Sequence, residues 1–147
     1  MVAVTAAGCG GGSSGADGIP SSITIAYQPG ISYAPLLIVK SEKMLEKKYP
    51  KTTFTWKVLS SGAPIRDGMI SGDIQVGAGG VGPLILGWAK GVDWRYLASM
   101  NDADLWLMAK SSKYRTLQDY KKYGGKIAMP SPTSIQSVVL RKAAAEK

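Results

Sequence analysis

The sequence predicts an α/β fold built on a largely parallel, doubly wound sheet. Between Ser22 and Lys90, a segment rich in Ile, Val, Thr and Tyr is three times followed by small or turn residues and then by a helix-like segment. Each helix-like segment carries a proline near its start, where a missing N–H costs no helical hydrogen bond. Strands that alternate with helices in this way pair in parallel, because each helix returns the chain to the same end of the sheet.

The first strand–helix unit opens with Ser22–Gln28, whose alternating pattern and β-favouring side chains are typical of a strand. Pro29 and Gly30 end this strand, because both residues favour turns. Tyr33–Lys48 then has the pattern of a helix, with Pro35 in its first turn and lysines near its end. We therefore expect one strand and one helix here.

The second and third units repeat this order. We expect two strands, at Thr52–Leu59 and Ile74–Val76, and two helices, at Ala63–Ser71 and Pro83–Lys90. Gly91 is a plausible C-terminal cap for the last helix.

Beyond Gly91 the pattern changes, and a polar stretch, Ser111–Gly125, interrupts the β-rich segments. A short capped helix is expected over Thr116–Tyr120 within this stretch. The remaining elements are three strands, Val92–Met100, Leu105–Lys110 and Lys126–Met129, and a final amphipathic helix, Ile135–Lys147.

The composition excludes several classes of site. The 147 residues include no histidine and one cysteine, which removes His-based catalytic triads, the usual zinc sites and an internal disulfide. The net charge of +8 comes from lysines spread through polar stretches, and no nucleic-acid-binding motif accompanies it. We therefore expect no catalytic residue, no metal, no cofactor and no nucleic-acid partner.

The N-terminal segment, residues 1–22, resembles a shortened bacterial lipoprotein signal followed by a flexible linker. Ala6-Ala7-Gly8-Cys9 fits a lipobox, in which the cysteine becomes the lipidated residue, and a Gly/Ser tract follows. Only eight residues precede Cys9 and none is basic, whereas a signal peptide carries a basic region and about 7–15 apolar residues. Lipidation of Cys9 is the expectation, and a free cysteine in a tail is the alternative.

Three glycines, Gly77, Gly79 and Gly82, spell the G-x-G-x-x-G pattern of dinucleotide-binding turns. Asp102, which lies 25 positions after Gly77, could serve as the acidic partner. The pattern nevertheless belongs to the third unit rather than the first, and Pro83 stands where a P-loop requires lysine. Three interpretations remain: a dinucleotide site, a tight turn with no ligand, and a loop that faces another kind of ligand.

Several short motifs recur in an order that resembles a known family. They are Tyr27-Gln28-Pro29-Gly30, Tyr33-Ala34-Pro35-Leu36, Ser60-Ser61-Gly62, Gly72-Asp73-Ile74, Gly79-Gly80-Val81-Gly82-Pro83, Ala89-Lys90-Gly91-Val92, Leu117 with Asp119, Gly124–Pro130 and Ser131–Ser134. Together they resemble the substrate-binding proteins of bacterial ABC importers of the nitrate/sulfonate/taurine group.

This resemblance implies a type II periplasmic-binding-protein-like fold, with two α/β lobes and a ligand between them. It places the first lobe at 23–104, a hinge crossing at 105–110 and the beginning of an incomplete second lobe at 111–147. It also implies an extracytoplasmic, lipid-anchored receptor that takes a small solute, such as a sulfonate, nitrate or taurine, and delivers it to the permease subunits of an ABC importer.

The candidates for the binding site are four loops, at 27–33, 60–63, 79–82 and 131–134. Each loop leads into a predicted helix, and the N–H groups at a helix N-terminus suit an anion. No lysine or arginine lies in them, and Arg66 is one helical turn away. The serines could equally cap helices, and the aromatic rings could equally pack in the core. The expected ligand-binding residues are Tyr27, Gln28, Tyr33, Ser60, Ser61, Gly62, Gly80, Val81, Asn101, Trp106, Ser131, Thr133 and Ser134.

Two other functions remain open for this fold. One is an enzyme that makes a pyrimidine precursor, or a binder of a thiamine precursor, since relatives with these roles share the architecture. The other is the sensing domain of a transcription regulator, which would require a DNA-binding motif before residue 22. A Gly80→Val variant should abolish ligand binding and leave the fold largely intact.

Overall fold

The computed structural model describes residues 18–102 and 104–146. It contains a three-stranded parallel sheet with the order β2-β1-β3, formed by β1 (Ser22–Tyr27), β2 (Thr53–Val58) and β3 (Val76–Gly77). The parallel α/β architecture expected from the sequence is therefore confirmed. The expected lipidation site, Cys9, and the lipobox around it lie outside the described residues.

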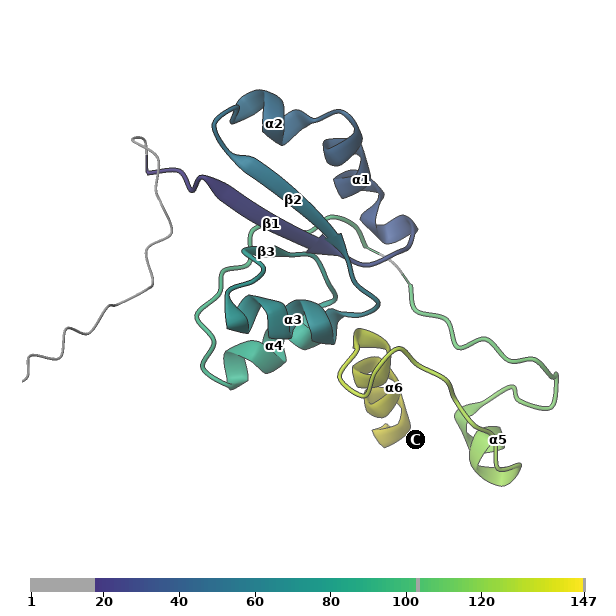
Figure 1. The fold of residues 1–147 in the computed structure, drawn as a ribbon. Helices are drawn as coiled ribbons and strands as arrows, with labels where there is room; N and C mark the ends of the chain where they lie inside the picture. Colours follow the sequence, from purple (N-terminus) through teal and green to yellow (C-terminus); the bar gives the residue numbers. More distant parts are fainter. Residues whose placement is uncertain (1–17, 103, 147) are drawn as a thin grey trace, which may run out of the picture.

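Helices cover both faces of the sheet. A short 3-10 turn, η1 (Ile31–Tyr33), leads into α1 (Ala34–Ser41) and α2 (Met44–Lys48), and Figure 1 shows this pair on the side of the sheet opposite to α3 (Gly62–Ser71) and α4 (Val81–Ala89). The crossover from β1 to β2 and the crossover from β2 to β3 run in opposite directions across the sheet. Two connections of the same hand therefore place their helices on opposite faces. This is the doubly wound arrangement.

The core lies between β1 and α3. Ala26, Ile65 and Ile74 are buried there, with Leu59 and Met69 packed against them. Ahead of the short strand β3, the side chain of Gln75 replaces part of the ladder, because its Oε1 accepts a hydrogen bond of 2.8 Å from the backbone N of Thr24. Backbone bonds from Gln75 N to Thr24 O at 3.1 Å and from Ala78 N to Ala26 O at 2.8 Å continue the pairing on both sides of β3.

The expectation of a single helix over Tyr33–Lys48 is wrong, because this segment forms two helices, α1 and α2. Lys43 has φ 50°, which lies in the left-handed region and interrupts the α-helical turn between α1 and α2. The break lets α2 pack on β2, where Glu46 accepts a hydrogen bond of 3.3 Å from Trp56 Nε1.

Three expected strands, Val92–Met100, Leu105–Lys110 and Lys126–Met129, are not formed in the described part of the chain. Each has strand-like composition but finds no neighbour for a ladder there, and a strand without a pairing partner is not stable. Trp94, in the first of these segments, instead packs on Gly87 of α4.

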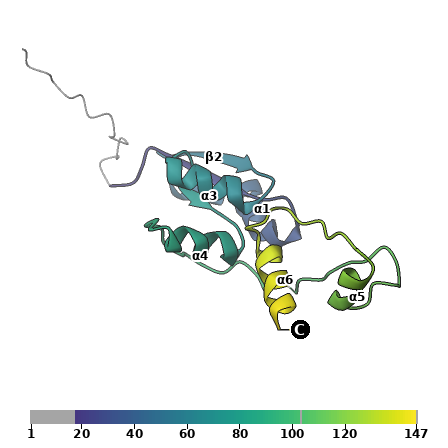
Figure 2. The same cartoon turned by 90° about the horizontal axis from the view of Figure 1, so that it is seen from below.

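Two more helices follow α4, after a long segment that has no helix or strand in the described residues. These are α5 (Leu117–Lys122) and α6 (Ile135–Ala145). Figures 1 and 2 both place α6 beside α4 and α5 farther from the sheet. The short capped helix expected over Thr116–Tyr120 is formed as α5, and its cap is a capping box in which Thr116 and Asp119 satisfy each other's backbone N–H groups.

Candidate ligand-binding site

The strand order creates a natural binding position at the carboxyl ends of β1 and β3. These two strands are neighbours, but the chain leaves β1 toward α1 on one face and leaves β3 toward α4 on the other. Ligands of open α/β sheets bind at such a switch point, because the departing loops separate there. The loops after β1 and β3 are therefore the candidate ligand-binding loops.

Gln28 lies between these two loops. Its Nε2 donates a hydrogen bond of 2.6 Å to the hydroxyl of Tyr33, and a Cβ added at Gly79 would lie 3.5 Å from the same nitrogen. Burial raises the pKa of the Tyr33 hydroxyl above 10.0, although the bond from Gln28 lowers it. Tyr33 therefore keeps its proton at neutral pH and, having accepted a bond from Gln28, is free to donate that proton to another group.

The N-termini of three helices meet beside this pair. A Cβ added at Gly62, the first residue of α3, would lie 2.7 Å from Cγ of Pro83 in the first turn of α4. A Cβ at Gly80, the N-cap of α4, would lie 2.9 Å from Cγ2 of Ile135, the first residue of α6. The three helix ends present N–H groups and positive dipole ends. We give the name loop cluster to these residues: Gln28, Tyr33, Ser61, Gly62, Gly79, Gly80, Ser131, Thr133 and Ser134.

The two N-cap serines of the loop cluster use their hydroxyls differently. Ser134 is 6% exposed and caps α6, because its Oγ accepts a hydrogen bond of 3.3 Å from the backbone N of Ser137. Ser61 is also 6% exposed, but its side chain makes no capping bond with α3. Ser61 is therefore a buried residue at a helix N-terminus whose hydroxyl does not cap the helix.

The remaining polar residues of the last loop are partly buried beside Ser134. Ser131 Oγ and Thr133 Oγ1 lie 3.4 Å apart, within hydrogen-bond range, and Ser134 N donates to Ser131 O at 3.2 Å. This loop thus contributes neutral donors and acceptors at the start of α6.

The loop cluster holds no cationic side chain of its own. Segments 27–33, 60–63, 79–82 and 131–134 contain neither lysine nor arginine. The nearest arginine along the chain, Arg66, is paired with Asp67 at 2.7 Å. An anion bound here would therefore be held by backbone N–H groups and neutral hydroxyls.

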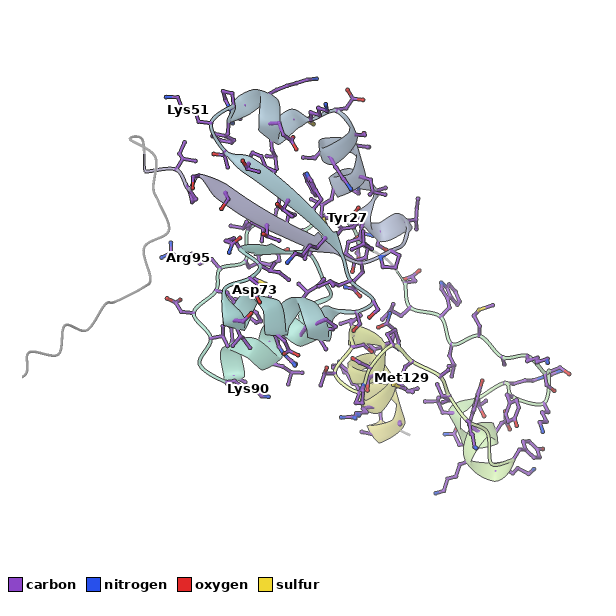
Figure 3. The ribbon with its side chains drawn as sticks, viewed as in Figure 1. Tyr27, Lys51, Asp73, Lys90, Arg95 and Met129 are labelled. Atoms are coloured by element: carbon purple, nitrogen blue, oxygen red, sulfur yellow. The ribbon has the colours of Figure 1, made fainter. Side chains whose placement is uncertain are left out.

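Tyr27 does not join the loop cluster. Its ring is 5% exposed and packs edge-on against Trp56 with centroids 6.3 Å apart, while Lys40 Nζ donates to its hydroxyl at 3.5 Å. Figure 3 shows Tyr27 near the end of β1, on the side of α1. The structure thus places this ring in a packing role between β1, β2 and α1.

Four other expected ligand-binding residues are exposed in the described structure. Ser60 and Val81 flank the loop cluster, whereas Asn101 and Trp106 lie on the extended chain beyond α4. Trp106 is 79% exposed and lines a different feature, an open groove of about 520 Å³ between the 105–107 segment, α5 and α6. The structure does not bring Trp106 to the loop cluster.

The groove was missed by reasoning from the sequence. Its lining is mostly apolar and includes Leu105, Tyr120, Ile127 and Leu140. The apolar residues of segments 105–110 and 126–129 were the available signal, but they were assigned to strands. Ile135, which packs on Gly80, was also not assigned to a site; its position directly after an N-cap serine was the clue.

Packing explains two of the three glycines of the G-x-G-x-x-G motif, Gly77 and Gly82. A Cβ at Gly77 would lie 2.6 Å from Cγ2 of Ile65, so this glycine lets α3 approach β3. A Cβ at Gly82 would lie 3.3 Å from Cγ2 of Val138, which belongs to α6. The start of α6 thus lies against the turn where a dinucleotide pyrophosphate would bind, which argues against the dinucleotide interpretation.

Within residues 18–102 and 104–146, no three His, Cys, Asp or Glu side chains come together in a group that could hold a metal ion. In the same ranges, no helix has both the length and the apolar character needed to cross a membrane.

Comparison with known proteins gives one family and one curated relative. The model of the NMT1-like family matches residues 17–147. A protein of Escherichia coli (strain K12), described as an aliphatic sulfonates-binding protein, is 30% identical over 129 residues, which is 86% of this chain and 39% of the relative. The chain therefore spans about two fifths of the length of that curated relative.

Two solved structures also align with part of the chain, each at 30% identity. The periplasmic aliphatic sulphonate binding protein SsuA from Escherichia coli aligns with a TM-score of 0.44 over 49% of this chain and 23% of that structure. The alkanesulfonate-binding protein SsuA from Xanthomonas axonopodis pv. citri, bound to MOPS, aligns with a TM-score of 0.45 over 50% and 25%.

Proposed function

The chain belongs to the NMT1-like family, and from that premise we propose that it acts as an extracytoplasmic receptor that captures a small anionic solute for an ABC importer. Likeness to a sulfonates-binding protein supports this role. The function is binding rather than catalysis, with the permease subunits of the importer as the partner that takes up the solute.

The observation that carries the proposal is the meeting of three helix N-termini at the carboxyl ends of β1 and β3. Gly62, Gly80 and Ile135 bring α3, α4 and α6 together there, with no cationic side chain in the four loops. Dipole ends and N–H groups attract a negative group without a formal positive charge. A monoanion such as a sulfonate or nitrate suits this environment.

Within this proposal, four side-chain hydroxyls make the polar contacts that fix the solute. Tyr33 donates from a hydroxyl that Gln28 orients, and Ser61 donates from the hydroxyl that does not cap α3. Ser131 and Thr133 supply further hydroxyls from the loop before α6. The 105–110 segment is the proposed hinge between the lobe at 23–104 and the residues that follow.

A thermal-shift screen of the full chain tests the proposed function. The ligands are taurine, ethanesulfonate, MOPS, nitrate, small carboxylates, an aminopyrimidine of the thiamine-precursor type and NAD. A ligand that binds only the folded state at about 100 times its Kd stabilises that state by roughly 2.7 kcal/mol, which raises the melting temperature.

We expect a selective rise with a sulfonate or nitrate. A rise with the aminopyrimidine alone would favour the thiamine-precursor binder or the pyrimidine-precursor enzyme. A rise with NAD alone would restore the dinucleotide interpretation of Gly77–Gly82. A cooperative melt that no ligand shifts would contradict solute capture by this chain.

A further inference from the structure

The outer surface of the α1–α2 layer combines exposed aliphatic side chains with lysines. In α1, Leu37 and Ile38 are 43% and 59% exposed, and in α2 Met44 is 51% exposed. Met44, Lys47 and Lys48 are spaced i, i+3 and i+4, so they share one helical face. We call the exposed set the basic apolar face; its members are Leu37, Ile38, Lys43, Met44, Lys47 and Lys48.

The acidic side chains of this layer do not balance its lysines. Glu46 turns toward the sheet, where its Oε1 accepts a hydrogen bond from Trp56 Nε1 and its Oε2 is buried. Glu42, the C-cap of α1, is therefore the exposed acid of this layer. The exposed lysines there include Lys43, Lys47 and Lys48. Lys51, labelled in Figure 3, adds another exposed cation in the turn after α2. The surface is positive and is complementary to an anionic partner.

We infer that the basic apolar face docks on the surface of an anionic phospholipid bilayer. Aliphatic side chains enter the boundary between headgroups and acyl chains, while lysine ammonium groups reach the phosphates, as in amphipathic helices that lie in the plane of a membrane. A protein partner fits less well, because protein interfaces are depleted in lysine and enriched in Trp, Tyr and Arg. The basic apolar face has none of those three residues.

The position of the basic apolar face leaves the N-termini of α3 and α4 uncovered. The basic apolar face lies on the layer opposite to α3 and α4 (Figure 1), so docking would leave the N-termini of these two helices uncovered. The inference is independent of which solute binds, and it differs from anchoring through Cys9, because it requires no lipid on the protein.

Vesicle cosedimentation of the unlipidated full chain tests the inference. The vesicles contain phosphatidylcholine alone or phosphatidylcholine mixed with phosphatidylglycerol. We expect at least about tenfold tighter binding to the mixed vesicles at about 0.1 M salt, and loss of this preference at about 1 M salt, where the Debye length falls from about 10 Å to about 3 Å. Equal binding to both kinds of vesicle at low salt would overturn the inference.

The chain offers a matched charge control. Lys47 and Lys48 end α2, and Lys121 and Lys122 end α5, so each pair lies in the last turn of a short helix. Lys47→Glu/Lys48→Glu should weaken binding to the mixed vesicles at least about tenfold, and Lys121→Glu/Lys122→Glu less than about threefold. Equal weakening by both double variants would mean that net charge alone drives binding, which overturns the inference.

Two further arms test the apolar contribution and the competing partner. Ile38→Ser leaves the net charge unchanged and should weaken binding a few-fold, because it removes exposed aliphatic surface from the face. Soluble polyglutamate represents an acidic protein surface. If polyglutamate bound as tightly as the mixed vesicles, or if Ile38→Ser had no effect on vesicle binding, bilayer docking would be overturned. Far-UV circular dichroism of each variant verifies its fold.

Discussion

Gln28 Nε2 donates a hydrogen bond of 2.6 Å to the hydroxyl of Tyr33, which joins the end of β1 to the turn that leads into α1. The bond occupies an acceptor position on the tyrosine oxygen and leaves its O–H hydrogen available. A neutral tyrosine held in this way can donate to the oxygen of an anionic solute. The pair therefore gives the loop cluster a directed donor without a formal charge.

Tyr33→Phe should weaken binding of the solute identified by the screen roughly tenfold, because one hydrogen bond to a charged acceptor is lost. Tyr27→Phe is the matched control, because Tyr27 packs against Trp56 outside the loop cluster. Isothermal titration calorimetry measures both affinities. An equal loss for Tyr27→Phe would return that residue to the binding site, and an unchanged affinity for Tyr33→Phe would remove Tyr33 from it.

The two buried N-cap serines, Ser61 and Ser134, should respond differently to substitution by alanine. Ser134→Ala removes the cap of α6 and should lower the free energy of unfolding by about 1 kcal/mol. Ser61→Ala removes no capping bond, so stability should stay within about 0.5 kcal/mol while solute affinity falls about tenfold. Denaturant unfolding and calorimetry separate the two effects, and a stability loss for Ser61→Ala equal to that of Ser134→Ala would contradict the assignment.

Gly80→Val should disturb packing as well as binding, which corrects the expectation that this variant leaves the fold largely intact. A Cβ at position 80 would lie 2.9 Å from Cβ and Cγ2 of Ile135, so the substitution must displace the start of α6. Gly80→Ala and Ile135→Ala should therefore couple in a double-mutant cycle on stability by roughly 0.5–3 kcal/mol, because the smaller side chain at 135 makes room for the added methyl group. Additive effects of the two substitutions would contradict the contact.

The carboxyl group of Asp119 should titrate below its ordinary pKa of 3.8. The backbone N–H of Arg115 at 2.9 Å is the largest cause, followed by the N–H and hydroxyl of Thr116 at 2.8 and 2.9 Å, because all three bonds favour the charged form. A depressed folded-state pKa adds stability to the capping box above about pH 3.8, and this stability is lost as the pH falls through the folded-state pKa.

A carboxyl ¹³C NMR titration measures this pKa directly. Thr116→Ala should raise it toward the ordinary value, because the hydroxyl donor is removed. If the Asp119 carboxyl titrated at or above 3.8 in the unsubstituted protein, the capping box would not form in solution.

Local patterns in the sequence predicted a large part of the fold. The alternation of Ser22–Gln28 and Thr52–Leu59 predicted β1 and β2, and the early prolines predicted the starts of α1, α3 and α4. The helix expected at Thr116 was also correct, because a capping box is complete within four residues. These features depend on side chains only a few positions apart, so they can be predicted from the sequence alone.

The candidate site required the tertiary structure. The loops around Gln28, Gly62 and Gly80 were expected to face a ligand, but only the fold joins Gly80 to Ile135 across more than fifty residues of sequence and turns Tyr27 toward Trp56. The strand-like segments at 92–100, 105–110 and 126–129 find no ladder partner in the described chain. The sequence by itself determined which segments favour helix or strand, since periodicity and capping are local; tertiary packing decided which segments pair and which faces meet, since those depend on contacts between distant residues.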